Sequence, residues 1–267
     1  IRDELRYALK DCMELMANGF IKDGANYKLR EYIQNEEVDA AEFYRLLLRT
    51  MYRLLFIATI EERDLVFPDT GNDEAKTRQQ KYRKIYEDFY SLNRLRNMAL
   101  SPVYIDPRKH DLWQGLMTTF RLFEPIGEGE KLDILPLGGT LFSENGLETG
   151  NINLYDLKLS NSVLLEILKK LTVFKDERRQ LIRVNYRDLD VEELGSIYEA
   201  LLELHPYFDT KAATPAFSFT SGSERKLTGS YYTRHDLVAQ LIKSALIPVM
   251  EQRLKDSGWD IKKKGYE

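Results

Sequence analysis

The residues of this chain best suited to binding a small ligand lie in one loop, Arg225-Lys226-Leu227-Thr228-Gly229-Ser230-Tyr231-Tyr232-Thr233. Gly229 allows the backbone to approach a ligand closely, and Tyr231 and Tyr232 offer flat aromatic faces for stacking. The loop runs into a helical pattern, so free amides and the positive end of a helix dipole favour a carboxylate or a phosphate. This chemistry suits a small zwitterionic ligand, although a capped turn with two half-buried tyrosines has the same pattern.

The helix that positions this loop is predicted to begin directly after Thr233. Thr233 and Asp236 have the spacing of a capping box, in which the hydroxyl and the carboxylate each accept a hydrogen bond from an otherwise unpaired amide. Pro248 is expected to end or kink this helix. Its apolar stripe recurs at helical spacing and consists of Leu237, Val238, Leu241, Ile242, Ala245, Leu246 and Val249.

The loop and its helix resemble motif X of adenine-specific DNA methyltransferases, the segment that opens their catalytic domain. In that family, motif X lines the pocket for the methionine end of S-adenosylmethionine. The resemblance implies that Arg225 and Lys226 contact DNA phosphates. It also implies a cofactor-binding role for Gly229, Tyr231, Tyr232 and Thr233.

Other segments are similar to the helical region that precedes motif X in large restriction-modification methylases. They are residues 43–48, 52–56, 61–63, 137–142 and 189–199 with 201–203, and they follow the order of the family. The resemblance therefore covers nearly the whole chain and points to a type IIG-like or phage-defence methylase. It implies a DNA-binding enzyme that flips adenine out of the duplex and transfers a methyl group from S-adenosylmethionine to its exocyclic nitrogen.

Two departures from the family pattern limit what this chain is expected to do alone. Arg234 stands where the family usually has a proline, which affects the conformation of the loop. The glycine-rich cofactor loop and the Asn/Asp-Pro-Pro-Tyr/Phe tetrapeptide that grips the adenine are absent, and no Pro-Pro pair occurs. We therefore interpret the chain as a fragment with no catalytic residues, inactive alone. Its expected partners are double-stranded DNA and the rest of the methyltransferase and target-recognition domains.

Composition agrees with a folded, helix-rich protein, since 43% of the 267 residues are hydrophobic and 31% are charged. The single cysteine, Cys12, excludes an internal disulfide, fits a reducing compartment and is expected to be a core residue of the first helix. The three histidines are far apart and show no ligand spacing, so no metal site is expected. No signal peptide or membrane span is visible. We expect a cytoplasmic protein.

Contacts with DNA must come from local basic patches, because the formal net charge is −4. One patch lies on a predicted helix at residues 76–84, where Lys81, Arg83 and Lys84 are candidate phosphate contacts. A second basic run covers residues 169–187. Both runs are also compatible with solvated helix faces balanced by acidic residues.

Two alternative functions remain open at this stage. Asp69 with Glu74 and Lys76 superficially resembles a metal-dependent nuclease site, in which acidic groups bind magnesium and a lysine polarises the attacking water. That site needs strands, whereas these residues fall on a loop and a helix start. The other alternative is a helical protein- or DNA-interaction module that binds no cofactor.

The predicted fold is mainly α: a multi-helix, bundle-like region with a short irregular or β segment near 125–150, then a linker and the first helix of a methyltransferase domain. We expect three parts, residues 1–124, 125–205 and 206–267, with 208–223 as a mobile linker. Strands are expected only near 131–142 and 184–186. Before the motif X helix, the helices are predicted at 3–17 (ended by Asn18-Gly19), 27–33, from an Asp39–Glu42 capping box to about 64, 74–90, 112–123, 162–171 and 191–204.

Overall fold

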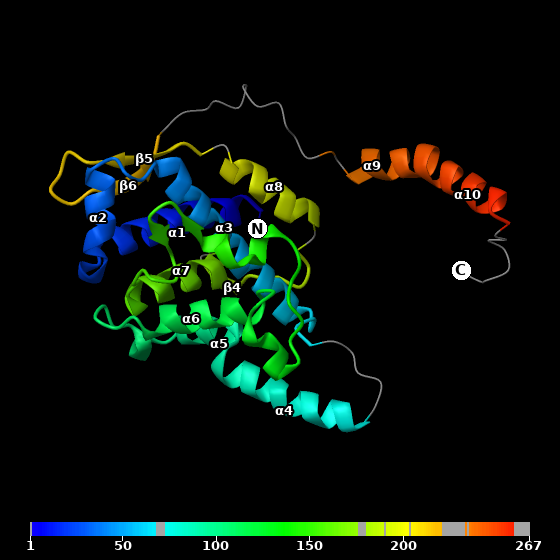
Figure 1. Cartoon of the computed structure of the whole chain (residues 1–267), viewed down its shortest axis with the longest axis horizontal. Helices are drawn as coiled ribbons and strands as arrows, with labels where there is room; N and C mark the ends of the chain where they lie inside the picture. Colours follow the sequence, from blue (N-terminus) through cyan, green and yellow to red (C-terminus); the bar gives the residue numbers. More distant parts are fainter. Residues whose placement is uncertain are drawn as a thin grey trace.

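The computed structural model describes residues 2–67, 73–175, 180–189, 191–202, 204–220, 233 and 235–258. Helices form most of this structure (Figure 1), which confirms the predicted mainly-α fold. They are α1 (Arg2–Lys22), α2 (Tyr27–Gln34), α3 (Ala40–Glu62), α4 (Asp73–Phe89), α5 (Leu92–Met98), α6 (Asp111–Leu122), α7 (Asn161–Thr172), α8 (Val191–Leu202), α9 (His235–Leu241) and α10 (Ile247–Asp256). A π-helical turn, Ile242–Leu246, joins α9 to α10.

The strands of the described segments form three separate two-stranded antiparallel sheets. They pair β1 (Glu148–Thr149) with β2 (Ile152–Asn153), β3 (Val173–Lys175) with β4 (Leu181–Arg183), and β5 (Pro206–Asp209) with β6 (Ala216–Phe219). Short 3-10 turns cover Gly24–Asn26, Pro102–Tyr104, Glu128–Leu132, Thr140–Phe142 and Glu144–Leu147. Each sheet is local, so the helices carry the core.

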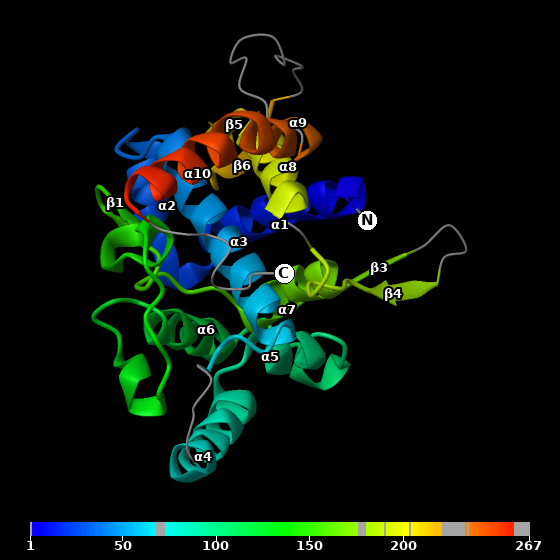
Figure 2. The same cartoon turned by 90° about the vertical axis from the view of Figure 1, so that its right-hand side faces the viewer.

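Helix α3 is the central element of the helical body (Figures 1 and 2). Its apolar residues cover more than one face, and Phe43, Leu47, Met51, Leu54 and Ile57 are all buried. A helix that is apolar on most sides is stable only when other elements surround it. Accordingly, α3 contacts α1, α5, β5 and the 3-10 turns between residues 140 and 147.

A buried ion pair fixes the irregular segment after α6 to α3. The Arg53 guanidinium lies 2.8 Å from the Glu124 carboxylate, and both side chains are almost fully buried. Arg53 also donates to the carbonyl oxygens of Leu141 (2.8 Å) and Ser143 (3.0 Å). Its guanidinium carbon lies 5.1 Å from the centre of the Phe142 ring. One side chain of α3 thus holds a segment that has little secondary structure of its own.

Most predicted helices are present with ends within two residues of the expected ones. The first helix is an exception, because α1 continues through Asn18-Gly19 to Lys22. The Asn18 side chain exchanges hydrogen bonds with the backbone of Phe217 in β6, at 2.9 and 3.0 Å. Gly19 lets α7 approach, since a Cβ there would lie 2.8 Å from Val163 Cγ1. The Asn18-Gly19 pair therefore does not end the helix, and instead makes contacts with β6 and α7.

The predicted strand positions were wrong. Residues 131–142 contain 3-10 turns and irregular backbone, and residues 184–186 are irregular although Val184 and Tyr186 are buried. The capping box at the start of α3 does not form either, because the Asp39 side chain accepts no capping hydrogen bond. Helix α5 was not predicted from the sequence, and its N-cap is Ser91, whose hydroxyl accepts a hydrogen bond from the Arg94 amide.

The expected linker at 208–223 begins with an ordered hairpin, β5–β6. Phe208 lies opposite Phe217 in its register, and the Phe217 and Phe219 side chains are buried against the helices. Phe217 packs edge-on against Phe43 of α3, with 6.0 Å between the ring centres. The alternation of aromatic residues is a strand signal, and these contacts explain why the segment is not a free linker. The rest of the predicted linker, from residue 221 on, lies outside the described residues.

Candidate functional site

The loop predicted to bind the cofactor lies mostly outside the described residues. This applies to Arg225, Lys226, Gly229, Tyr231 and Tyr232, and also to Arg234. Thr233 is described and is exposed, two residues before the start of α9. Asp236 lies in the first turn of α9, where the predicted capping box places it. Helix α9 begins at His235, within one residue of the predicted start, and the capping box and the geometry of the loop stay predictions.

The helical segment after Thr233 continues past Pro248, the residue that was predicted to end or kink it. The π-helical turn at Ile242–Leu246 directly precedes α10, and Pro248 sits in the first turn of α10, where its missing amide is tolerated. Most of the apolar stripe is open to solvent: Leu237, Leu241, Leu246 and Val249 are each more than half exposed. This segment lies apart from the helical body in Figure 1. It presents an apolar face suited to packing against further structure.

The first basic patch lies on α4, which projects from one end of the body (Figures 1 and 2). Lys76, Lys81 and Lys84 are exposed. They make no ion pair with other described residues, and no Asp or Glu occurs between residues 75 and 86. Lys81 and Lys84 are three residues apart and therefore share one helix face. These two lysines have the exposure that a phosphate contact requires.

The two arginines of α4 are engaged within the protein. Arg78 forms an ion pair with Asp133 at 3.0 Å. Arg83, which the sequence analysis proposes as a DNA contact, pairs with Asp64 and lies over the Phe67 ring, with 5.2 Å to its centre. Sequence could not reveal this, because both partners come from other elements. Arg83 is therefore less available for DNA than Lys81 and Lys84.

The second basic run, residues 169–187, is divided among several elements. Lys169 and Lys170 lie in the last turn of α7, where Lys170 pairs with Asp11 at 3.3 Å. Arg183 of β4 donates to Asn93 (2.6 Å) and Asn97 of α5. The described residues of this run therefore do not form one continuous basic face, and residues 176–179 lie outside the described structure.

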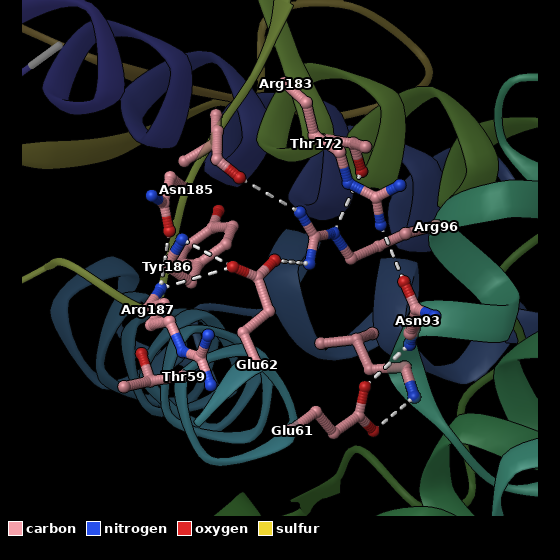
Figure 3. A network of polar contacts seen from close by, with 12 residues as sticks. Thr59, Glu61, Glu62, Asn93, Arg96, Thr172, Arg183, Asn185, Tyr186 and Arg187 are labelled. Carbon is pink, nitrogen blue, oxygen red and sulfur yellow. Dashed lines mark hydrogen bonds and ion pairs between the residues drawn. The ribbon is translucent and has the colours of Figure 1, made fainter. Parts of the chain in front are cut away.

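A polar network at the end of α3 begins with Glu61 (Figure 3). The Glu61 carboxylate accepts from the Tyr86 hydroxyl (2.7 Å) and from the backbone amides of Leu92 (2.7 Å) and Asn93 (2.8 Å). Burial raises the pKa of Glu61 above its ordinary value, and these three hydrogen bonds act in the opposite direction. The side chain thereby ties α3 to α4 and to the first turn of α5.

The neighbouring residues extend this network to the segment after β4. Glu62 pairs with the buried Arg96 at 2.6 Å and accepts from the amides of Tyr186 (2.8 Å) and Arg187 (3.2 Å). Arg63 donates to the carbonyl oxygens of Arg187 and Leu189. Every carboxylate oxygen of Glu61 and Glu62 has a partner within the chain. Glu61, Glu62 and Arg63 therefore hold the end of α3 against α4, α5 and the segment after β4.

The predicted cofactor loop lies outside the described residues except for Thr233, so no cavity is assigned to it. A cleft of about 660 Å³ between α3, α4 and α5 includes Arg83, but its acidic residues Glu61, Asp64, Glu87 and Asp88 make it a poor site for an anion. Of the residues of the nuclease alternative, Glu74 and Lys76 are exposed on α4, and Asp69 lies outside the described residues. Across the described ranges, no group of three or more His, Cys, Asp or Glu residues could hold a metal ion.

The single cysteine, Cys12, is buried in α1, as predicted, and burial raises the pKa of its thiol. The His110 Nε2 atom lies 2.6 Å from a carboxylate oxygen of Asp23, the residue before the 3-10 turn Gly24–Asn26. None of the helices in the described part of the chain is both long and apolar enough to span a membrane.

Comparison with protein-family models, curated proteins and solved structures finds no match for this chain.

Proposed function

We propose that this chain is the helical part of an S-adenosylmethionine-dependent, adenine-specific DNA methyltransferase of restriction-modification or phage-defence type, ending in motif X. The observation that carries the proposal is the position of Thr233, exposed and two residues before the start of α9. The resemblance requires the Gly-Ser-Tyr-Tyr-Thr segment to lie at a helix N-terminus, where free amides favour the cofactor carboxylate. The exposed apolar stripe of α9 and α10 supports the same proposal, because a methyltransferase core packed there would cover it.

The segments that resemble the helical region of these enzymes also converge on one element. Residues 43–48, 52–56 and 61–62 belong to α3, and Arg63 follows directly as its C-cap. Residues 137–142 are held to α3 through Arg53, which bonds to the Leu141 carbonyl. Helix α8 contacts α3 where the Tyr52 and Tyr198 rings lie 5.3 Å apart. This convergence supports their interpretation as parts of one structural unit.

In the proposed enzyme, Gly229, Tyr231, Tyr232 and Thr233 form one wall of the methionine pocket. The catalytic groups belong to a methyltransferase core outside this chain, so the chain alone methylates nothing. Its contribution is to orient motif X and to contact the DNA backbone, while the core flips and methylates adenine.

The proposal predicts that Thr233→Ala weakens cofactor binding in a protein that includes the methyltransferase core. Loss of one helix-capping hydrogen bond costs about 1 kcal/mol, which is about fivefold in the dissociation constant for S-adenosylmethionine. Titration calorimetry measures this change, and Tyr232→Ala is expected to act in the same direction. Thr118→Ala is a matched control, since Thr118 is exposed on α6 and bonds only to the Gln114 carbonyl.

The assignment of the pocket fails if Thr233→Ala and Tyr232→Ala both keep full cofactor affinity while DNA binding collapses. In that case the loop would be a DNA clamp.

A second prediction concerns DNA binding by α4. Lys81→Gln with Lys84→Gln is expected to reduce the slope of log affinity against log salt concentration by about 2, because each lost phosphate contact removes about 0.9. Fluorescence anisotropy with a labelled duplex at several salt concentrations gives this slope. Lys28→Gln with Lys211→Gln is the control, since these exposed lysines lie on α2 and the β5–β6 turn, far from α4 in Figure 1. If the slope fell equally in both double variants, the net charge of the protein, and not α4, would determine DNA binding.

A further inference from the structure

A groove of about 520 Å³ lies where the β3–β4 hairpin leaves the helical body, remote in sequence from motif X. Figure 2 shows that this hairpin extends beyond the helices. The residues that line the groove come from α7, from both strands and from the connection between α5 and α6. They include Ile105, Leu165, Lys169, Val173, Phe174 and Leu181.

The groove presents large apolar side chains to solvent. Leu181 is 63% exposed and Ile105 is 51% exposed. The other long hairpin of the chain behaves differently, because β6 buries Phe217 and Phe219 against the helices. A two-stranded ribbon that packs only at its base gains little stability from its own contacts. Exposed apolar residues gathered in a groove are typical of a protein-binding surface.

Two of the three charged side chains among the described residues that line the groove are positive. Lys169 and Lys170 line it from α7, and Glu166 is the one carboxylate among the described residues that line it. Lys169 is exposed and forms no ion pair with any described residue, whereas Lys170 pairs with Asp11. A partner with apolar residues on one face and carboxylates beside them complements this surface. DNA complements it less well, because a phosphate backbone has nothing to place against Ile105 and Leu181.

We propose that this groove binds an acidic amphipathic segment of a partner protein. Apolar residues of that segment pack against Ile105, Phe174 and Leu181, and its carboxylates face Lys169. The proposal does not depend on the proposed methyltransferase function, since it rests only on residues of α7, of the β3–β4 hairpin and of the connection between α5 and α6.

Two fluorescein-labelled peptides of about 18 residues, or five helical turns, test the proposal by anisotropy on the whole chain. Both peptides carry leucine at positions i, i+3, i+4 and i+7, and the remaining positions are mostly glutamate in one and mostly lysine in the other. The glutamate peptide is expected to bind at least about tenfold more tightly than the lysine peptide, a difference of about 1.4 kcal/mol. Ile105→Ser with Leu181→Ser is expected to weaken its binding by about tenfold.

Ile126→Ser with Leu135→Ser is the matched control, because it removes side chains of the same type that are 78% and 62% exposed outside the groove. This control is expected to bind the glutamate peptide like the unmodified chain. Lys169→Glu changes only an exposed charge and is expected to shift the preference toward the lysine peptide by several-fold.

Four results would overturn the proposal. The first two are no binding of the glutamate peptide and no preference between the peptides. The other two are an equal loss of affinity in the Ile105/Leu181 and Ile126/Leu135 double variants, and an unchanged preference after Lys169→Glu. Displacement of the bound peptide by duplex DNA would assign the groove to nucleic acid instead. Self-association that the Ile105 and Leu181 substitutions abolish would assign it to a second copy of the chain. Light scattering measures that association.

Discussion

Arg53→Met is expected to lower the free energy of unfolding by about 3–5 kcal/mol, because it leaves the buried Glu124 carboxylate without its ionic partner. The substitution also removes the donors to the Leu141 and Ser143 carbonyl oxygens. Glu124 keeps the Tyr155 hydroxyl as a donor, which cannot replace a full positive charge. Urea unfolding followed by far-ultraviolet circular dichroism measures the change.

Arg78→Met provides the matched control for this prediction. Arg78 also ties the segment after α6 to a helix, through Asp133, but its side chain is 60% exposed. Exposed ion pairs contribute at most about 1 kcal/mol, so this variant should remain close to the unmodified chain. Adding Glu124→Leu to Arg53→Met should recover part of the loss, because it removes the unpaired charge. Equal effects of Arg53→Met and Arg78→Met would show that Arg53 is not a buried anchor.

The helices could be predicted from sequence because their signals are local. Apolar residues at helical spacing place α3, α6 and α7, and the burial of Leu54 and Phe120 follows from the same pattern. The end of α1 could not be predicted in this way. Its Asn18-Gly19 pair has the composition of a helix stop, but contacts with β6 and α7 continue the helix.

The anchoring of residues 125–155 depends on contacts between distant parts of the chain. Residues 131–142 take their conformation from Arg53, 88 residues before Leu141, and from the end of α6. No local sequence pattern indicates that Arg53 bonds to the Leu141 carbonyl oxygen. The β5–β6 hairpin does have a local signal in its alternating aromatic residues, but the many small and polar residues around it favour the interpretation as a linker.

The candidate site was predictable only in part for a similar reason. Sequence identifies the exposed lysines of α4 correctly as accessible charges, but it does not show that Arg83 is engaged by Asp64 and Phe67. The groove beside β3 and β4 was missed because its residues come from three stretches of sequence. Residues such as Ile105 and Leu181 look individually like ordinary core residues, and only the fold shows that they remain exposed.

Gly127→Ala is expected to destabilise the chain by roughly 3 kcal/mol, the upper end of the cost of overpacking a tightly packed site. A Cβ at this position would lie 1.6 Å from the Arg121 carbonyl oxygen and 2.9 Å from the Glu124 carbonyl oxygen. Both contacts involve the backbone at the end of α6, so no side-chain rotation relieves them. The backbone must shift there. This shift weakens the hydrogen bond from the Gly127 amide to the Glu124 carbonyl oxygen, and it disturbs Glu124, the ionic partner of Arg53.

Gly115→Ala is the control, and it is expected to act in the opposite direction. Gly115 lies inside α6, and a Cβ added there meets no atom within 4 Å. Alanine is favoured over glycine within a helix by about 0.5–1 kcal/mol, so this variant should be more stable than the unmodified chain. Thermal and urea unfolding of both variants give the comparison. If Gly127→Ala were as stable as Gly115→Ala, the segment after α6 would not be packed against the helix end, and the buried site of Arg53 would lose its structural basis.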